Sequence, residues 1–286
     1  MTVILSWNIQ SGRGADGRAD LERTLAAIKA LGPADVICLQ EVARSDPHWD
    51  ESSADQLAVI GSRFAGYEAF FGPAYDRRIP GKAARRAFGN LVLSRLPVLQ
   101  VFAHPLPQRP FPGLRSMPRQ ALEVVVQAEG GPLRIITTHL EYSDPRPRTL
   151  QIKRLRDLML DSQPVAGPYA TDGSDPSGAW PRPKDLVICG DFNMLPDSPE
   201  YADLLQSGVE AAPTLFDAWR EANKGVAHAP TVGVFDKEQW PQGPLCCDFF
   251  FLSEPLRRSV RSATVDSETD ASDHQPLRLD LCSSRT

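Results

Sequence analysis

Apolar and polar positions follow two different rhythms along this chain. Short apolar runs bounded by glycine, proline or polar residues are typical of buried strands. We expect such strands at residues 2–7, 35–40, 67–71, 90–94, 98–102, 120–127, 133–138, 186–189, 249–252, 259–265 and 276–281. Apolar residues spaced three or four apart instead predict amphipathic helices. These lie at residues 20–31, 54–64, 149–160, 199–206 and 214–221.

The distribution of these elements predicts an α/β fold. Strands and helices occur in both halves of the chain, which favours two packed sheets flanked by helices over a singly wound parallel sheet. We predict one domain over residues 1–286, with an irregular surface loop at about residues 163–184 that is rich in Pro, Gly, Ser and Asp. A strand-like segment resumes directly after this loop, so we interpret it as an insertion and not as a domain boundary.

Charge restricts the classes of partner. The net charge is −5 and the isoelectric point is about 5.6, which excludes the broad basic surface of a tight, nonspecific duplex binder. An anionic substrate would therefore have to be held by local charge. Two local segments are basic, residues 74–87 (AYDRRIPGKAARRA) and 108–119 (QRPFPGLRSMPR). The first is either a solvated loop or a basic flap that holds the flanking phosphates of an extended anion, with Tyr75 as a stacking surface.

Other features of the sequence indicate a cytoplasmic protein. No apolar run approaches the ~20 residues needed to cross a bilayer, and the N-terminal residues lack the basic region of a secretory signal. The five cysteines include no C-x-x-C pair, so a zinc site is not expected. The sequence leaves the oligomeric state open.

Polar residues with catalytic chemistry stand where the predicted strands begin or end. A side chain at such a position is held by a rigid scaffold and still reaches a cleft. The residues in question are Asn8, Glu41, His139, Asp191, Asn193, Asp248, Asp273 and His274. Because they are spread from one end of the chain to the other, they predict a site that only the folded chain assembles.

The segments around these residues resemble the ordered motifs of the endonuclease/exonuclease/phosphatase superfamily. They are SWNIQ (6–10), LQEV (39–42), FGNLVLSR (88–95), THL (138–140), GDFN (190–193) and SDH (272–274), and they run in order over nearly the whole chain. The resemblance implies a four-layer α/β/β/α sandwich of two mixed sheets, with a cleft at one end of both. It also implies divalent-metal-dependent hydrolysis of a phosphodiester or phosphomonoester by an activated water, without a covalent enzyme intermediate.

Residue chemistry and the resemblance together suggest a role for each position. Hard oxygen ligands suit Mg²⁺ or Mn²⁺, so we expect Glu41 to bind the metal. Asn8 is expected to be another ligand or to contact one, and Asp273 to be a second carboxylate near the metal. The resemblance implies that Asp191 orients or deprotonates the water and that Asn193 holds a phosphate oxygen. It also implies that His274 acts on the phosphate as acid–base or cation. Further roles by resemblance are Asp248 as acceptor from the other ring nitrogen of His274, His139 as a second catalytic histidine, and Asn90 and Arg119 as substrate contacts.

Each of these positions also has an ordinary structural interpretation. Glu41 and His274 could be solvated loop residues, Asp191 and Asn90 turn residues, His139 a packing residue, Asp248 a turn cap and Arg119 an edge charge. The convergence of six ordered motifs favours the functional interpretation.

Three hypotheses for the function remain open. They are a nuclease or apurinic endonuclease, a phosphatase or phosphodiesterase acting on a small or lipid-derived phosphoester of the inositol phosphate or sphingomyelin type, and an inactive binding module. The last is disfavoured because no expected catalytic position is replaced. The tyrosine-bearing middle segment usual in exonuclease III-type enzymes has no clear equivalent here, which weakens the apurinic endonuclease hypothesis. The number of metals and endo- versus exonucleolytic action also stay open.

Overall fold

Two six-stranded mixed sheets carry the described part of the chain in this computed structural model, which covers residues 1–49, 55–81, 83–161, 182–206 and 214–282. The first sheet contains β1 (Thr2–Asn8), β2 (Val36–Arg44), β3 (Glu68–Arg78), β4 (Arg85–Ser94), β11 (Val260–Val265) and β12 (Leu277–Leu281). The second contains β5 (Val98–Pro105), β6 (Gln120–Ala128), β7 (Gly131–His139), β8 (Leu186–Asp191), β9 (Leu215–Asp217) and β10 (Asp248–Ser253). Their strand orders are β11-β12-β1-β2-β4-β3 and β5-β6-β7-β8-β10-β9.

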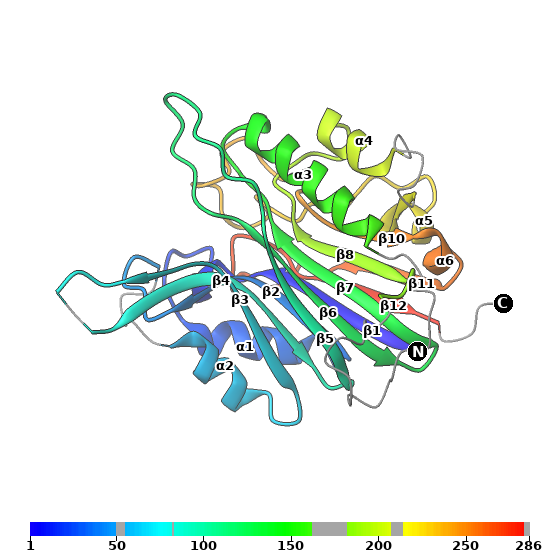
Figure 1. Cartoon of the computed structure of the whole chain (residues 1–286), viewed down its shortest axis with the longest axis horizontal. Helices are drawn as coiled ribbons and strands as arrows, with labels where there is room; N and C mark the ends of the chain where they lie inside the picture. The colour runs from blue at the N-terminus through cyan, green and yellow to red at the C-terminus, as the bar shows by residue number, and fades with distance from the viewer. Residues whose placement is uncertain (50–54, 82, 162–181, 207–213, 283–286) are drawn as a thin grey trace.

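Helices cover the outer face of each sheet. The helical segments of the described residues are η1 (Gln10–Gly12, a 3₁₀ turn), α1 (Leu21–Ala30), α2 (Gln56–Arg63), α3 (Pro145–Leu160), α4 (Pro199–Leu205), α5 (Ala218–Ala222) and α6 (Glu254–Arg257). The short helices α5 and α6 pack instead against the cluster between the sheets, through Ala218 and Leu256. Helices α1 and α2 lie on the first sheet and α3 and α4 on the second (Figure 1). Asp20, Asp144 and Ser198 begin α1, α3 and α4 by accepting hydrogen bonds from backbone N–H groups of the first turn.

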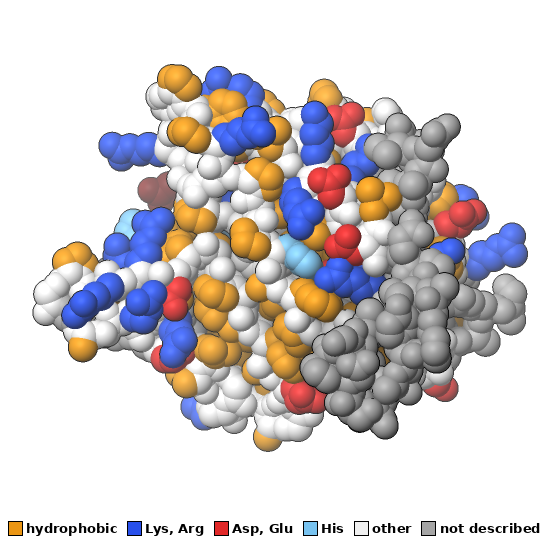
Figure 2. Space-filling view, in the orientation of Figure 1, with side chains coloured by type: hydrophobic (Ala, Val, Ile, Leu, Met, Phe, Trp, Pro, Cys, Tyr) orange, Lys and Arg blue, Asp and Glu red, His pale blue; other side chains and the backbone are white. Residues whose placement is uncertain are grey.

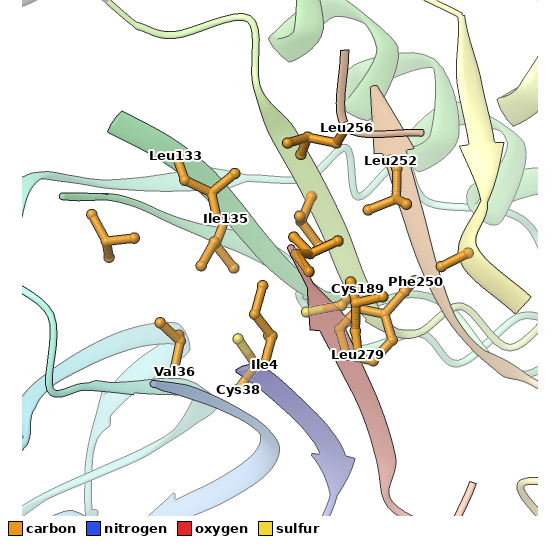
Figure 3. Packing of buried hydrophobic residues seen from close by; sticks show 14 of the residues in the cluster. Ile4, Val36, Cys38, Leu133, Ile135, Cys189, Phe250, Leu252, Leu256 and Leu279 are labelled. Atoms are coloured by element: carbon orange, nitrogen blue, oxygen red, sulfur yellow. The ribbon is translucent and has the colours of Figure 1, made fainter. Parts of the chain in front are cut away.

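The apolar core is divided into layers by strand alternation. In β1, Val3, Leu5 and Trp7 pack outward with α1, whereas Ile4 faces the second sheet. Between the sheets lies a cluster to which both contribute, including Ile4, Val36, Cys38, Ile135, Cys189, Phe250 and Leu279 (Figure 3). The predicted α/β/β/α sandwich is therefore confirmed.

Most predicted elements are present within a few residues of their expected bounds, and two differ. Residues 214–221 form a strand followed by a helix, because Leu215 pairs with Ser253 of β10 and Asp217 then caps α5 by accepting from Trp219 N and Arg220 N. Residues 74–78 and 85–87 belong to a long β3–β4 hairpin, whereas the sequence predicts a loop or flap there. The predicted loop at 163–184 lies almost entirely outside the described residues.

Two arms extend from one end of the sandwich. The β3–β4 hairpin forms one, and the connection from β5 to β6 at residues 106–119 forms the other (Figure 1). The strand ends that carry the predicted site residues meet at this same end, as described below. In the described part of the chain, no helix is long and apolar enough to cross a membrane.

Candidate active site

Three neighbouring strands place three of the predicted residues side by side. In the second sheet His139, the last residue of β7, is the register partner of Asp191, the last residue of β8. Asp191 is in turn the partner of Asp248, the first residue of β10. Since β7 and β8 are parallel and β10 is antiparallel to them, all three side chains lie in one row at one edge of the sheet.

Strand alternation turns these side chains toward the opposite sheet. Asp191 follows Val187 and Cys189, and Asp248 precedes Phe250, on the face that packs between the sheets. Asn8 likewise follows Ile4 on the inner face of β1. Alternate residues of a strand share one face, so the apolar inter-sheet layer continues directly into a layer of polar groups.

Glu41 would face away from this layer in a regular strand, and a β-bulge reorients it. The register of β2 with β4 shifts by one residue between Leu39 and Val42, and Glu41 adopts φ 59°. Gln10, Ser11 and Asn193 also have positive φ, at 44°, 52° and 50°. Left-handed backbone costs energy in residues other than glycine and concentrates at functional sites, and these four residues all lie around the predicted site.

Gly190 allows Asp191 to lie this close to β7. Its φ is +129°, and a Cβ at this position would come 2.0 Å from the Thr138 carbonyl oxygen. Only glycine permits both the backbone conformation and the close approach. The Gly-Asp order in GDFN is therefore required by backbone packing.

The Oδ2 atom of Asp191 is the centre of the polar cluster. It lies 3.0 Å from Asn8 Nδ2, 3.3 Å from His139 Nε2 and 3.6 Å from His274 Nε2. Its other oxygen accepts from the backbone N–H of Asn193 at 2.9 Å. This carboxylate is 1% exposed, and burial is the main cause that raises the pKa of Asp191 to about 7.

The imidazole of His274 lies between two carboxylates. Its Nδ1 atom is 2.9 Å from Asp248 Oδ2, and the opposite nitrogen faces Asp191. The hydroxyl of Thr231 donates a hydrogen bond to the same Asp248 oxygen at 2.6 Å. That hydroxyl also accepts hydrogen bonds from the backbone N–H groups of Cys247 and Asp248. The Asp248 carboxylate is therefore held in one orientation.

The two histidines have opposite electrostatic environments. Burial lowers the pKa of His139 well below its ordinary value, and the positive charges of Arg119 and His274 lower it further. Burial acts in the same direction on His274, but the carboxylates of Asp248, Asp273 and Asp191 outweigh it, so the pKa of His274 is raised well above normal. At neutral pH one imidazole is uncharged and the other is a cation, as expected when a site separates acid and base roles.

Oxygen-bearing side chains also converge beside Asp191. Asn8 Nδ2 bridges Asp191 and Glu41, at 3.2 Å from Glu41 Oε1. Burial and the charge of Asp273 raise the pKa of Glu41, so a cation near these carboxylates would relieve their repulsion. Carboxylate and amide oxygens are the ligand type of Mg²⁺ and Mn²⁺, and the residues fit such an ion.

A different trio also has metal-like spacing. Among the described residues, one ligand atom each of Asp191, Asp248 and His274 lies within 4.8 Å of the other two. The Nδ1 atom of His274 and the Oδ2 atom of Asp248 are already occupied by each other. Glu41 and Asp273, which line the cleft, stay the predicted ligands of a cation, with Asn8 in contact with Glu41.

These groups line a cleft of about 740 Å³. Of the predicted residues, Glu41, Arg119, His139, Asp191, Asn193, Asp273 and His274 line it. Asn8 and Asp248 lie just behind its wall, in contact with Asp191 and His274. Asn90 does not line this cleft: it is 3% exposed and donates to the Gln120 carbonyl oxygen.

Several residues that line the cleft were not predicted. Trp240 donates its indole N–H to Asp273 Oδ2 at 3.3 Å and packs edge-on against the His274 ring, with centroids 6.0 Å apart. Trp49 and Tyr142 add aromatic surface. These residues come from irregular segments without strand or helix periodicity, so no pattern in the sequence marks them.

The fold is thus a two-sheet α/β sandwich with carboxylate, amide and imidazole groups gathered in a cleft at one end. The chain belongs to the endonuclease/exonuclease/phosphatase family, whose model matches residues 5–274. Members of this family are phosphoester hydrolases. The predicted family is thus confirmed.

Several solved structures share this fold. An endonuclease/exonuclease/phosphatase from Beutenbergia cavernae is 25% identical with a TM-score of 0.72, over 98% of this chain and 71% of that one. A mannosyl-6-phosphatase from Bacteroides thetaiotaomicron has 17% identity and a TM-score of 0.68, covering 98% and 99%. The human Nocturnin catalytic domain has 20% identity and a TM-score of 0.60, covering 98% and 93%. None of the curated proteins compared with the chain matches it.

Proposed function

We propose that this protein hydrolyses phosphoesters with a divalent cation, by in-line attack of a water that Asp191 orients or deprotonates. The observation that carries the proposal is the position of Asp191 Oδ2, shared among Asn8, His139 and His274 at 3.0 to 3.6 Å. A buried carboxylate with a pKa near neutrality suits a general base that works around pH 7.

The remaining side chains act on the phosphoryl group. His274, kept cationic by Asp248, stabilises charge on the phosphoryl oxygens or donates a proton. His139 is neutral and has one ring nitrogen toward Asp191, so it acts as a hydrogen-bond partner of the water or phosphate. Asn193 and Arg119 line the cleft and bind phosphate oxygens.

Glu41, Asn8 and Asp273 would hold Mg²⁺ or Mn²⁺. Such an ion neutralises charge on the phosphoryl oxygens when bound. Asp191 keeps its separate role toward the water, since its oxygens are engaged by Asn8, Asn193 and the two histidines.

Two substrate classes fit this chemistry, phosphodiesters of nucleic acid and smaller phosphoesters. The cleft volume lies in the range of about 300–1,000 Å³ that small-molecule sites occupy. This observation supports the second class, a small phosphoester. A panel of single-stranded DNA, abasic DNA, inositol phosphates, sphingomyelin and bis(4-nitrophenyl) phosphate, assayed with Mg²⁺ and Mn²⁺, tests the proposal. Hydrolysis of at least one member is expected. No turnover of any substrate with either metal would contradict the proposal.

Thr231 is expected to act through Asp248. Thr231→Val keeps the shape of the buried side chain but removes the hydroxyl that donates to Asp248 Oδ2. Removing a group that orients a functional side chain typically lowers activity about 10- to 100-fold, so we expect a fall in kcat of this size with KM nearly unchanged. Steady-state kinetics on the best panel substrate measure this, and Thr231→Ser should restore most of the rate. A serine variant as slow as the valine variant would contradict the role.

A further inference from the structure

The β3–β4 hairpin carries arginines directly opposite each other on its two strands. In its ladder Arg77 is paired directly with Arg86, and Arg78 directly with Arg85. Like charges directly opposite each other in an antiparallel pair repel and destabilise the sheet. Basic side chains gather on this arm in the space-filling view (Figure 2). An anion bound to the hairpin would relieve this repulsion.

The two faces of the hairpin differ in what surrounds the arginines. On one face, which we call the cleft-side face, Tyr75 and Phe88 are register partners next to Arg77 and Arg86. Arg77 lies over the Tyr75 ring, with 4.8 Å from Cζ to the ring centroid. On the other face Asp76 neutralises Arg85 through a 2.7 Å ion pair.

The cleft-side face continues into the catalytic cleft. Trp49, which lines the cleft, stacks on Phe88 with centroids 4.6 Å apart and donates its indole N–H to the Tyr75 hydroxyl at 2.7 Å. That hydroxyl donates to the buried Asp46, which also faces Arg86 at 3.6 Å. A fixed aromatic surface thus leads from the cleft wall to two arginines.

We propose that the cleft-side face binds the backbone phosphates of a single-stranded nucleic acid next to the phosphate that is cleaved. This inference rests on the proposed phosphoester hydrolysis and names its substrate class. Arg77 and Arg86 contact phosphates, while Trp49 offers ring surface to a base, the combination typical of single-strand grooves.

The rest of the cleft favours one strand over a duplex. Its lining also includes the carboxylates of Asp16 and Glu238, which would repel the phosphates of a second strand. A membrane is also a poor partner for the hairpin. Insertion needs exposed bulky apolar groups, and within the described residues of β3 and β4 no large apolar side chain is exposed.

The two faces supply a matched pair of variants. R77Q/R86Q removes two charges from the cleft-side face, and R78Q/R85Q removes the same number from the opposite face of the same strands. Binding of a fluorescein-labelled oligo(dT) is measured by anisotropy in EDTA between 50 and 200 mM salt, so the readout does not depend on catalysis. Hydrolysis of bis(4-nitrophenyl) phosphate and the melting temperature show whether each variant keeps its site and its fold.

For R77Q/R86Q we expect the slope of log affinity against log salt concentration to decrease in magnitude by about 1.4, since each phosphate contact on a single strand contributes about 0.7 to this slope. We expect affinity at 50 mM salt to fall about tenfold or more, with unchanged hydrolysis of the small substrate. R78Q/R85Q should lose less than about threefold, because its charges act only at long range.

Equal losses in both variants, or no loss in either, would overturn the proposal. The proposal would also be overturned, in favour of a lipid surface, if the wild type sedimented with phosphatidylserine vesicles and R77Q/R86Q did not, while R77Q/R86Q still bound the oligonucleotide normally. Failure of the proposed function shows differently: it leaves wild-type oligonucleotide binding in place while no phosphoester of the panel is hydrolysed.

Discussion

Replacing Asp191 with Asn is expected to lower kcat by about 10³- to 10⁴-fold, because the amide cannot accept a proton from water. The shape of the side chain and its contact with the Asn193 backbone N–H are largely retained. Steady-state kinetics on the best phosphoester of the panel measure the effect. KM should change little, since Arg119 and Asn193 still line the cleft.

The same substitution should change the melting temperature little, because two effects oppose each other. Burial and the neighbouring Asp248 disfavour the charge of Asp191, whereas the His274 cation favours it. Asp203→Asn, on the exposed face of α4, is the matched control and should have wild-type kinetics and stability. Near-normal turnover in Asp191→Asn would remove this residue from the mechanism.

Replacing His274 with Gln is expected to reduce both activity and stability. We expect kcat to fall about 10²- to 10⁴-fold through loss of the acid–base group or cation. The melting temperature should also fall, because Asp191 and Asp248 then face each other without the cation between them. Removing one partner of a buried ion pair costs about 3–5 kcal/mol. Thermal unfolding and kinetics of the same preparation measure both effects.

A double variant separates the two losses. Asp248→Asn combined with His274→Gln removes one of the two carboxylate charges that lose the imidazolium between them. The double variant should therefore recover most of the stability lost by His274→Gln, while its activity stays low. If the single variant were as stable as the wild type, the imidazole would not be balancing these carboxylates. If it were also active, His274 would have no role in the reaction.

Much of the fold follows from local pattern. The alternation of apolar residues marks most strands, and polar residues directly after Trp7, Gln40 and Gly190 mark where the site lies. The pairing of strands across the sheet could not be predicted, because the register that aligns His139, Asp191 and Asp248 joins segments about 50 residues apart or more. The β-bulge that reorients Glu41 leaves no trace in the residue pattern either.

Residues in irregular segments were beyond prediction for a different reason. Thr231 and Trp240 contact Asp248 and Asp273, but their segment lacks periodicity. The spacing of apolar residues predicts a helix over residues 214–221, but the pairing of β9 with β10 makes its first part a strand. For residues 74–87 the sequence predicts a loop or flap, because Pro80 and Gly81 interrupt the apolar alternation that marks strands.

The central claim is that Asp191 works together with a divalent cation held by Glu41, Asn8 and Asp273. Its most direct test is the hydrolysis rate of the best panel substrate after chelation with EDTA and removal of the chelator, followed by titration with Mg²⁺ or Mn²⁺. We predict that the chelated protein is inactive while keeping its fold by circular dichroism, and that activity returns along a saturating curve that Glu41→Gln shifts to higher metal concentration. Full activity in the metal-free protein would contradict the account.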